Sequence, residues 1–327
     1  APPAPLLLVF LLAPVGTAAS GVLNGSFLTD VVRMRPGEVF RRDIGVYLPG
    51  ETIGIRSFAA DLVFEGGVEP VPLSHTYMHH WFVVQKHAHN AGFCELKQPA
   101  AMTLDYFFGV GSESRRTPVS LPEPYVIVVD NRDDWILDLH TIDLRNTTDP
   151  LACRECLCKE TNVDPQIPDY IGGLACCHDG VKCRTQGPDD RPMHYQLRYN
   201  LTWVEDEELK MRTPVDIFVM DVTGKFDPNE EVQCAIEYDV PRVEGDIYWR
   251  NSSFSFDRSG TVVLTVPHLH SGGVFAQISR NSTGELLCRG DALYGNGTEA
   301  GNEKGYVVGI SPCSNTWKFM KDEVVDI

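Results

Sequence analysis

The sequence predicts an all-β protein made of two antiparallel, jelly-roll-like β-sandwich domains joined by a cysteine-rich connector. Short β-rich runs alternate with Gly, Pro and Asp turn signals, and strict helical periodicity is hard to find. A chain of 327 residues is also long enough for two domains of ordinary size. The composition, with 43% hydrophobic and 22% charged residues, is typical of a folded globular protein.

The elements expected for the first sandwich lie between Val31 and His140. They are the β-rich runs 52–56, 59–64, 79–85, 125–129 and 135–140. Between Cys153 and Cys183 the strand pattern gives way to clustered cysteines with Pro and Asp. We therefore expect a connector held together by disulfides.

Alternation of apolar and polar residues then returns, which predicts a second sandwich. Its expected strands are residues 195–203, 215–222, 261–266 and 273–278, the last followed by a hairpin tip at 281–284. A single candidate strand after these would leave a sheet edge uncovered, so we expect the second sandwich to be incomplete at its C-terminus. The predicted boundaries are 1–19 for an incomplete signal peptide, 20–150 for the first sandwich, 151–194 for the connector and 195–327 for the second sandwich.

The first residues indicate entry into the secretory pathway. The apolar run 6–12 is followed by the small residues 17–19, as in a signal peptide, and it is too short to span a bilayer. We expect a secreted or extracellular glycoprotein without a transmembrane segment in this sequence. Attachment to a membrane through residues beyond Ile327 stays open.

The cysteines and glycosylation sequons point to the same compartment. An even number of cysteines in an oxidising lumen favours disulfides over a zinc cluster, although the pairing cannot be deduced. The candidate disulfide residues are Cys94, Cys153, Cys156, Cys158, Cys176, Cys177, Cys183, Cys234, Cys288 and Cys313. The candidate glycosylation sites are Asn24, Asn146, Asn200, Asn251, Asn281 and Asn296.

The charge of the chain argues against nucleic acid as a partner. The formal net charge is −17, and no cluster of Lys and Arg is present to neutralise phosphates. The substrate or partner that we expect is instead a small molecule or a peptide.

Five histidines in three predicted strands are the candidate metal ligands. His268 and His270 lie two apart, so in a strand they would share a face at a separation of about 6.6 Å. His79 and His80 are adjacent and would point to opposite faces, so a shared ion requires a β-bulge or a strand end. His140 alone in an apolar strand is equally explained as a hydrogen-bonded structural residue. A site built on imidazoles suits copper or zinc, and a redox role would require copper.

No other motif of the chain predicts a catalytic group. The sequence lacks a Gly-x-Ser-x-Gly nucleophile motif, and the glycines of residues 109–116 lack the Lys and the context of a phosphate-binding loop. We expect a structured loop there, in which Glu113 pairs with Arg115 or Arg116.

Several segments together resemble the stress up-regulated nodulin family of plants and algae. They are residues 77–84, 111–118, 139–143, 172–177, 268–273, 294–297 and 299–306. The resemblance covers nearly everything after the leader. It does not by itself imply a biochemical function.

A more distant likeness is to the copper type II ascorbate-dependent monooxygenases. The order of a His-His pair, a third His and a His-x-His motif followed by Gly is similar to that superfamily, in which two nine-stranded sandwiches each hold one copper. The likeness implies an electron-transfer copper at His79, His80 and His140, an oxygen-activating copper at His268 and His270, and ascorbate as reductant. The superfamily's second site also has a Met ligand, and the surroundings of Met320, which is the only methionine after His270, do not resemble it.

Two functions are therefore expected as alternatives. The first is a secreted copper-binding glycoprotein that hydroxylates an organic substrate with dioxygen. The second is a non-enzymatic extracellular protein, related to stress or structure, whose metal site is structural or absent.

Overall fold

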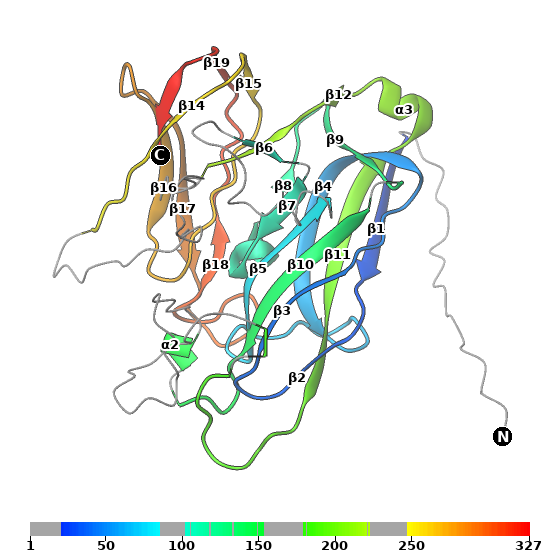
Figure 1. The fold of residues 1–327 in the computed structure, drawn as a ribbon, viewed down its shortest axis with the longest axis vertical. Coiled ribbons are helices and arrows are strands. Elements are labelled where there is room, and N and C mark those ends of the chain that lie inside the picture. The colour runs from blue at the N-terminus through cyan, green and yellow to red at the C-terminus, as the bar shows by residue number, and fades with distance from the viewer. Residues whose placement is uncertain are drawn as a thin grey trace, which may run out of the picture.

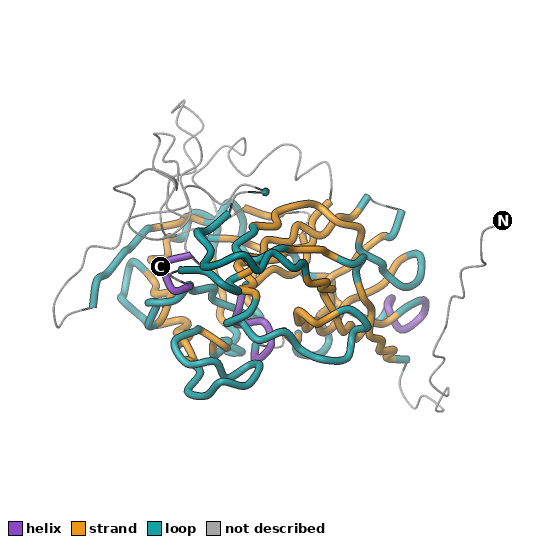
Figure 2. Tube along the Cα trace, turned by 90° about the horizontal axis from the view of Figure 1, so that it is seen from below, coloured by secondary structure: helices purple, strands orange, loops and turns teal. Residues whose placement is uncertain are grey.

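The computed structural model describes residues 21–85, 102–104, 106–117, 119–132, 134–148, 150–153, 179–180, 182–220, 222 and 247–327. Strands and loops make up almost all of this part of the chain, as Figures 1 and 2 show. The strands pair antiparallel, apart from a short parallel contact between β12 (Thr213–Pro214) and β9 (Tyr125–Asp130). The predicted all-β sandwich fold is confirmed.

The larger part of the molecule, called here the N-terminal sandwich, contains two sheets. One has the strand order β1-β11-β4-β9-β12 with β2 and β8 attached, and the other has the order β3-β10-β5-β7. The bounds of these strands are β1 Val22–Leu28, β2 Val32–Met34, β3 Val39–Gly45, β4 Thr52–Phe64, β5 Thr76–Gln85, β7 Tyr106–Val110, β8 Val119–Ser120, β9 Tyr125–Asp130, β10 Trp135–Asp143, β11 Met193–Val204 and β12 Thr213–Pro214. A separate pair is formed by β6 Met102–Leu104 and β13 Ile217–Val219.

The remaining strands form what we call the C-terminal sheets. Their orders are β14-β20-β16-β17-β18 and β15-β19. The bounds are β14 Ser253–Ser255, β15 Gly260–Val262, β16 Phe275–Arg280, β17 Leu286–Tyr294, β18 Val307–Ile310, β19 Trp317–Phe319 and β20 Val324–Asp326. The short helices are the 3-10 helix η1 Ser112–Arg116, α2 Pro150–Cys153 and α3 Asp206–Lys210.

Aromatic side chains from facing sheets fill the core of the N-terminal sandwich. Phe58 on β4 stacks on Trp81 of β5 with ring centroids 4.9 Å apart, and on Tyr199 of β11 at 5.9 Å. All three side chains are almost completely buried. The indole nitrogen of Trp81 donates to the Ser114 hydroxyl at 2.8 Å, so the buried polar atom is satisfied. This packing fixes β5 one residue beyond the histidine pair.

The strand predicted at 195–203 belongs to the N-terminal sandwich. It forms β11, which pairs with β1 on one side and β4 on the other. Its alternate residues Tyr195, Leu197, Tyr199 and Leu201 are buried in the same core as β4. The period-2 pattern therefore predicted the strand but not its sheet. The domain boundaries at residues 150 and 195 stay a prediction.

The two predicted runs 52–56 and 59–64 form one continuous strand, β4. Apolar side chains are buried along its whole length, and the strand continues through a register shift against β11 that leaves Arg56 without a counterpart. In the C-terminal sheets, the hairpin predicted at 281–284 joins β16 to β17, with Gly284 at a φ of 71°. Positive φ is the conformation that glycine adopts without steric cost.

The C-terminal sheets have a smaller core of their own. Phe256 and Phe319 stack with ring centroids 3.9 Å apart, beside Trp317 and Phe254. A disulfide joins Cys288 to Cys313. A small core with a covalent link is a common way to stabilise a limited amount of buried surface.

The 3-10 helix η1 joins the two parts of the molecule. The Ser112 hydroxyl donates to the Val307 carbonyl at 2.8 Å, and the Ile310 amide donates to the Thr117 hydroxyl at 2.8 Å. Tyr306 packs into the core of the N-terminal sandwich. The two parts therefore form one packed unit, with η1 lying against β18.

Disulfides form where the structure describes the cysteines. Besides Cys288–Cys313, Cys153 pairs with Cys183 at a Cα–Cα distance of 6.0 Å. The other candidates lie outside the described residues, namely Cys94, Cys156, Cys158, Cys176, Cys177 and Cys234. Among the helices that the structure describes, none is long and apolar enough to cross a membrane.

Candidate metal centre

A β-bulge on β5 places the adjacent histidines on one side of the sheet. His80 lies opposite His140 of β10, but the next pair is Met78 with Thr141, so His79 is an extra residue without a counterpart. An extra residue locally breaks the alternation of faces and re-aims a side chain. A β-bulge or a strand end is required if His79 and His80 are to share an ion. The register of β5 and β10 supplies the bulge.

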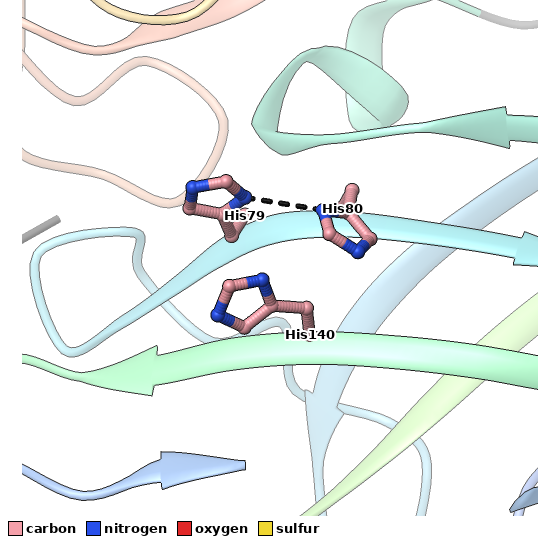
Figure 3. A group of neighbouring side chains, drawn as sticks. All are labelled: His79, His80 and His140. Carbon is pink, nitrogen blue, oxygen red and sulfur yellow. Dashed lines mark hydrogen bonds between the residues drawn. The ribbon is translucent and has the colours of Figure 1, made fainter. Parts of the chain in front are cut away.

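The three imidazoles converge from neighbouring strands, as Figure 3 shows. The Nδ1 atoms of His79 and His80 are 3.2 Å apart, and the rings of His79 and His140 stack with centroids 4.3 Å apart. One candidate ligand atom from each of the three residues lies within 4.8 Å of the others. Two nitrogens at about 2.0 Å from one tetrahedral ion are about 3.3 Å apart. The separation of the two Nδ1 atoms is therefore that of two ligands on one ion.

Burial keeps the three imidazoles neutral. His140 is 1% exposed, and neither ring nitrogen has a hydrogen-bond partner in the described part of the chain. Burial, reinforced by the neighbouring imidazoles, holds the pKa values of His79 and His140 well below the ordinary histidine value. Neutral imidazole is the form that binds metals. A metal ion would satisfy the ring nitrogen of His140 that carries the lone pair, one of the two nitrogens that the protein leaves without a hydrogen bond.

His80 has a carboxylate beside it. Its Nε2 lies 3.5 Å from Oδ1 of Asp138, which is buried on β10. Burial lowers the pKa of His80, while Asp138 acts in the opposite direction. A carboxylate at Nε2 leaves Nδ1, which faces His79, as the atom for a metal.

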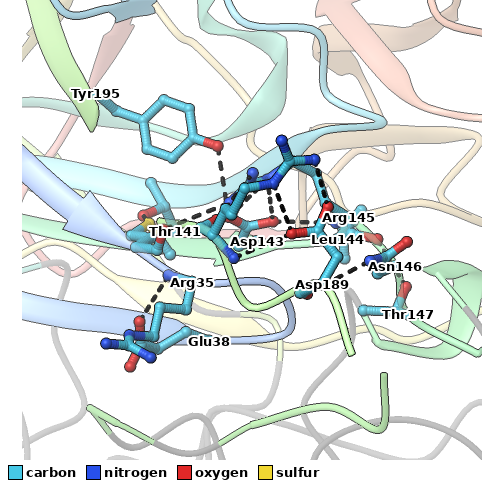
Figure 4. A network of polar contacts seen from close by, with 12 residues as sticks. Arg35, Glu38, Thr141, Asp143, Leu144, Arg145, Asn146, Thr147, Asp189 and Tyr195 are labelled. Atoms are coloured by element: carbon cyan, nitrogen blue, oxygen red, sulfur yellow. Dashed lines mark hydrogen bonds and ion pairs between the residues drawn. The ribbon is translucent and has the colours of Figure 1, made fainter. Parts of the chain in front are cut away.

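A buried ion pair fixes the end of β10 close to His140 (Figure 4). Arg145 Nη2 lies 2.6 Å from Oδ2 of Asp143, whose side chain is completely buried, and Tyr195 donates to the same oxygen at 3.4 Å. The backbone of Asp143 also bonds to Glu38 and Gly37. The strand that carries His140 is thus held by side chains and backbone together.

His268 and His270 lie in an irregular segment between β15 and β16. The predicted strand 261–266 is confirmed only at residues 261–262, and its continuation to His270 is wrong. Only Gly260–Val262 is strand, followed by an isolated bridge at Thr265. Pro267 lacks the N–H that a ladder needs, and the turn at Gly272 has a φ of 97°.

The structure nevertheless brings this pair to the other histidines. The His270 ring lies 4.4 Å from that of His79 and 5.0 Å from that of His268, measured between centroids. The five histidines, called here the histidine cluster, are thus contiguous: His79, His80, His140, His268 and His270. The monooxygenase likeness implies one copper site in each sandwich. In the structure, the histidines of both implied sites lie side by side at the junction of the two parts.

Glu113 is a residue of this centre that the sequence analysis missed. Its Oε1 lies 2.5 Å from Nδ1 of His268, and its side chain is completely buried. Burial alone would raise the pKa of this carboxyl, but the charge and hydrogen bond of His268, with backbone N–H groups, hold that pKa below its ordinary value. The spacing of charges along residues 111–116 carried no signal for this long-range contact.

Arg115, one of the two predicted partners of Glu113, binds elsewhere. Arg115 pairs with Asp61 at 2.5 Å and approaches Glu303 at 3.6 Å. A 3-10 helix has three residues per turn, so side chains two residues apart point in different directions. Here Glu113 faces His268 while Arg115 faces Asp61 of β4.

The surroundings of Met320 do not favour it as a thioether ligand. It follows β19 and is 64% exposed, and Figure 1 shows β19 well away from β5 and β10. The described part of the cluster therefore consists of imidazoles with carboxylates beside two of them, Asp138 at His80 and Glu113 at His268.

The fold and the cluster define an all-β protein with a histidine-rich candidate metal centre. The family model described as Stress up-regulated Nod 19 matches residues 22–324, and the chain belongs to this family. Among curated proteins, none matches the chain significantly in sequence. The resemblance to the nodulin family is confirmed, and the likeness to copper monooxygenases stays a prediction.

Proposed function

We propose that this protein binds copper through His79, His80 and His140, with His268 and His270 as further imidazoles of the same centre. The observation that carries the proposal is His140, a buried ring whose two nitrogens have no hydrogen-bond partner among the described residues. Buried polar atoms are costly unless satisfied, and two more imidazole rings lie within ligand distance.

The donor set favours copper or zinc over calcium and magnesium, because it offers nitrogen rather than oxygen. Between the two, copper is favoured by the resemblance of the histidine motifs to copper monooxygenases. The finer proposal is an oxidation of a small molecule or peptide that consumes dioxygen and a reductant such as ascorbate.

Bound copper would supply one-electron chemistry with dioxygen, which no side chain provides. The protein's own contribution is geometric: β5 and β10 fix three rings, and their burial excludes water from His79 and His140. His268 has a side chain 37% exposed, so the cluster reaches the surface at this residue. A substrate would approach from that side.

The proposal also places the protein in the secretory pathway. Disulfides join Cys153 to Cys183 and Cys288 to Cys313, as expected of an oxidising compartment. All six sequon asparagines are exposed, so each is accessible to a glycan: Asn24, Asn146, Asn200, Asn251, Asn281 and Asn296.

The position of Met320 favours a second candidate function. Without a soft thioether at the described cluster, stabilisation of reduced copper is weaker, and a purely structural metal site becomes the alternative. In that case the metal would stabilise the junction between the two parts of the molecule without catalysing a reaction.

Metal analysis of protein purified from a secretory host tests the proposal. Wild type should retain copper after dialysis, and His140→Ala should lose it because a ligand is removed. His194→Ala is the matched control, since His194 lies on β11 and pairs with Glu65 at the surface. Its copper content should equal that of wild type.

Two outcomes separate the functions. Ascorbate-dependent oxygen uptake by wild type but not by His140→Ala supports the oxidation. Copper or zinc binding that raises thermal stability without oxygen uptake supports the structural site. A folded wild-type protein with no affinity for either metal would refute both.

A further inference from the structure

Glu113 has the position of a residue that acts on the cluster through His268. It sits in η1 with a side chain 0% exposed, beneath an imidazole whose side chain is 37% exposed. A buried carboxylate is costly unless it is paired and hydrogen-bonded. The contact of 2.5 Å between Oε1 and Nδ1 of His268 therefore ties the two residues together strongly.

The backbone before Glu113 is shaped to admit the imidazole. A Cβ atom added to Gly111 would meet the carbonyl oxygen of His79 at 2.3 Å and Cε1 of His268 at 2.8 Å. Only a residue without a side chain allows η1 to begin against both histidines. The same short segment thus touches His79 of β5 and His268 in residues 263–273, called here the histidine loop.

The segment is also held firmly on its other side. Ser112 and Thr117 bond to the backbone of Val307 and Ile310, and Ser114 accepts from Trp81. A carboxylate placed by so many contacts has little freedom to follow a mobile partner. The partner, His268, takes its orientation from the carboxylate.

We propose that Glu113 is the positioning residue that fixes His268 for the metal centre and so joins the ligands of the two parts. The inference rests on the proposed function. An imidazole that donates from Nδ1 to a carboxylate carries its lone pair on Nε2, which is then the atom that binds metal. Such a carboxylate also raises the basicity of the ligand nitrogen, and its loss typically weakens metal binding about 10- to 100-fold.

Copper affinity, measured by competition with a chelator, tests the inference on the full-length chain. Glu113→Ala should weaken Cu(II) binding about 10- to 100-fold. Glu113→Gln should restore part of the loss, because the amide oxygen still accepts from Nδ1. Glu303→Gln is the matched control: Glu303 is also buried at this junction but faces Leu73 and Arg115. Its copper affinity should be that of wild type.

A second variant separates positioning from folding. In His268→Asn the side-chain amide can replace the Nδ1 donor to Glu113, but no atom replaces Nε2. Without metal, His268→Asn should be as thermally stable as metal-free wild type. Its copper affinity should be lowered, as in Glu113→Ala. Combining Glu113→Ala with His268→Asn should weaken binding no further than the larger single effect, since both act through one atom. The Cu(II) electron paramagnetic resonance spectrum should differ from that of wild type in Glu113→Ala and in His268→Asn.

The results that overturn the inference differ from those that overturn the proposed function. If wild type binds no copper, the proposed function fails. If wild type binds copper while His268→Asn and Glu113→Gln leave its affinity and spectrum unchanged, His268 is not a ligand and only the inference fails. These two variants decide the question even if Glu113→Ala does not fold.

Discussion

The N-terminal sandwich and the C-terminal sheets bring histidines to the same place by different means. On β5 and β10 the rings are held by paired strands, a bulge and a large aromatic core. In the C-terminal sheets the two rings lie on a loop that depends on a disulfide, a short bridge and the contact with Glu113. The comparison teaches that one set of ligands is preformed by its sheet, whereas the other is docked onto it.

The preformed half should be the more sensitive to loss of its internal ion pair. Arg145→Met leaves Asp143 buried without its cation, and breaking such a pair typically costs about 3 to 5 kcal/mol. Chemical denaturation should show the loss as a lower free energy of unfolding. The copper site should weaken with it, because Asp143 ends the strand that carries His140.

Arg191→Met is the control for that variant. Arg191 pairs with Asp189 in the same sequence pattern, but its side chain is 86% exposed, so little stability should be lost. Equal denaturation midpoints for the two variants would show that β10 does not depend on the buried pair.

The docked half should depend more on its covalent link. Replacing Cys288 and Cys313 by Ser should cost about 2 to 4 kcal/mol by freeing the unfolded chain. The backbone of Cys313 pairs with Thr265, three residues before His268, so the histidine loop should loosen first. Hydrogen exchange should rise in residues 263–273 before it rises in β5 and β10, and one copper should still bind.

The Cys153–Cys183 bridge provides the comparison for that experiment. Its residues are separated by 30 positions, against 25 for the other bridge, so the entropic effect is similar. Its removal should leave exchange in residues 263–273 unchanged. Simultaneous opening of β5 and the loop in either variant would show that the two halves are not held differently.

The smallest loss of stability is expected for a substitution at Gly111, where the two halves are in contact. Gly111→Ala adds a methyl group against His79 and His268, and overpacking of this kind costs about 1 to 3 kcal/mol. Copper affinity should fall while each half stays folded. Gly45→Ala on β3 is the control, because no atom lies within 4 Å of the added Cβ. Identical copper affinities in the two variants would contradict the docking contact.

The sequence predicted where strands form better than it predicted which strands pair with one another. β-rich runs between turn signals located β5, β9 and β10, and a period-2 pattern located β11. The assignment of β11 to the first sheet could not be read from the pattern, since period 2 says which face is buried but not against which sheet.

The candidate site was predicted by residue type and only partly by geometry. The need for a bulge at His79 and His80 followed from strand stereochemistry, and the register confirms it. The loop conformation of His268 and His270 depends on Pro267 and on packing against η1. Glu113 could not be found, because its contact with His268 spans 155 residues and leaves no local spacing.

The most direct test of the convergence is a crystal structure of the copper-loaded protein with anomalous diffraction at the copper edge. The account predicts a copper peak bound by ring nitrogens of His79, His80 and His140 at about 2.0 Å, with His268 and His270 beside it. A peak bound elsewhere, or the five rings unchanged and without metal, would contradict it.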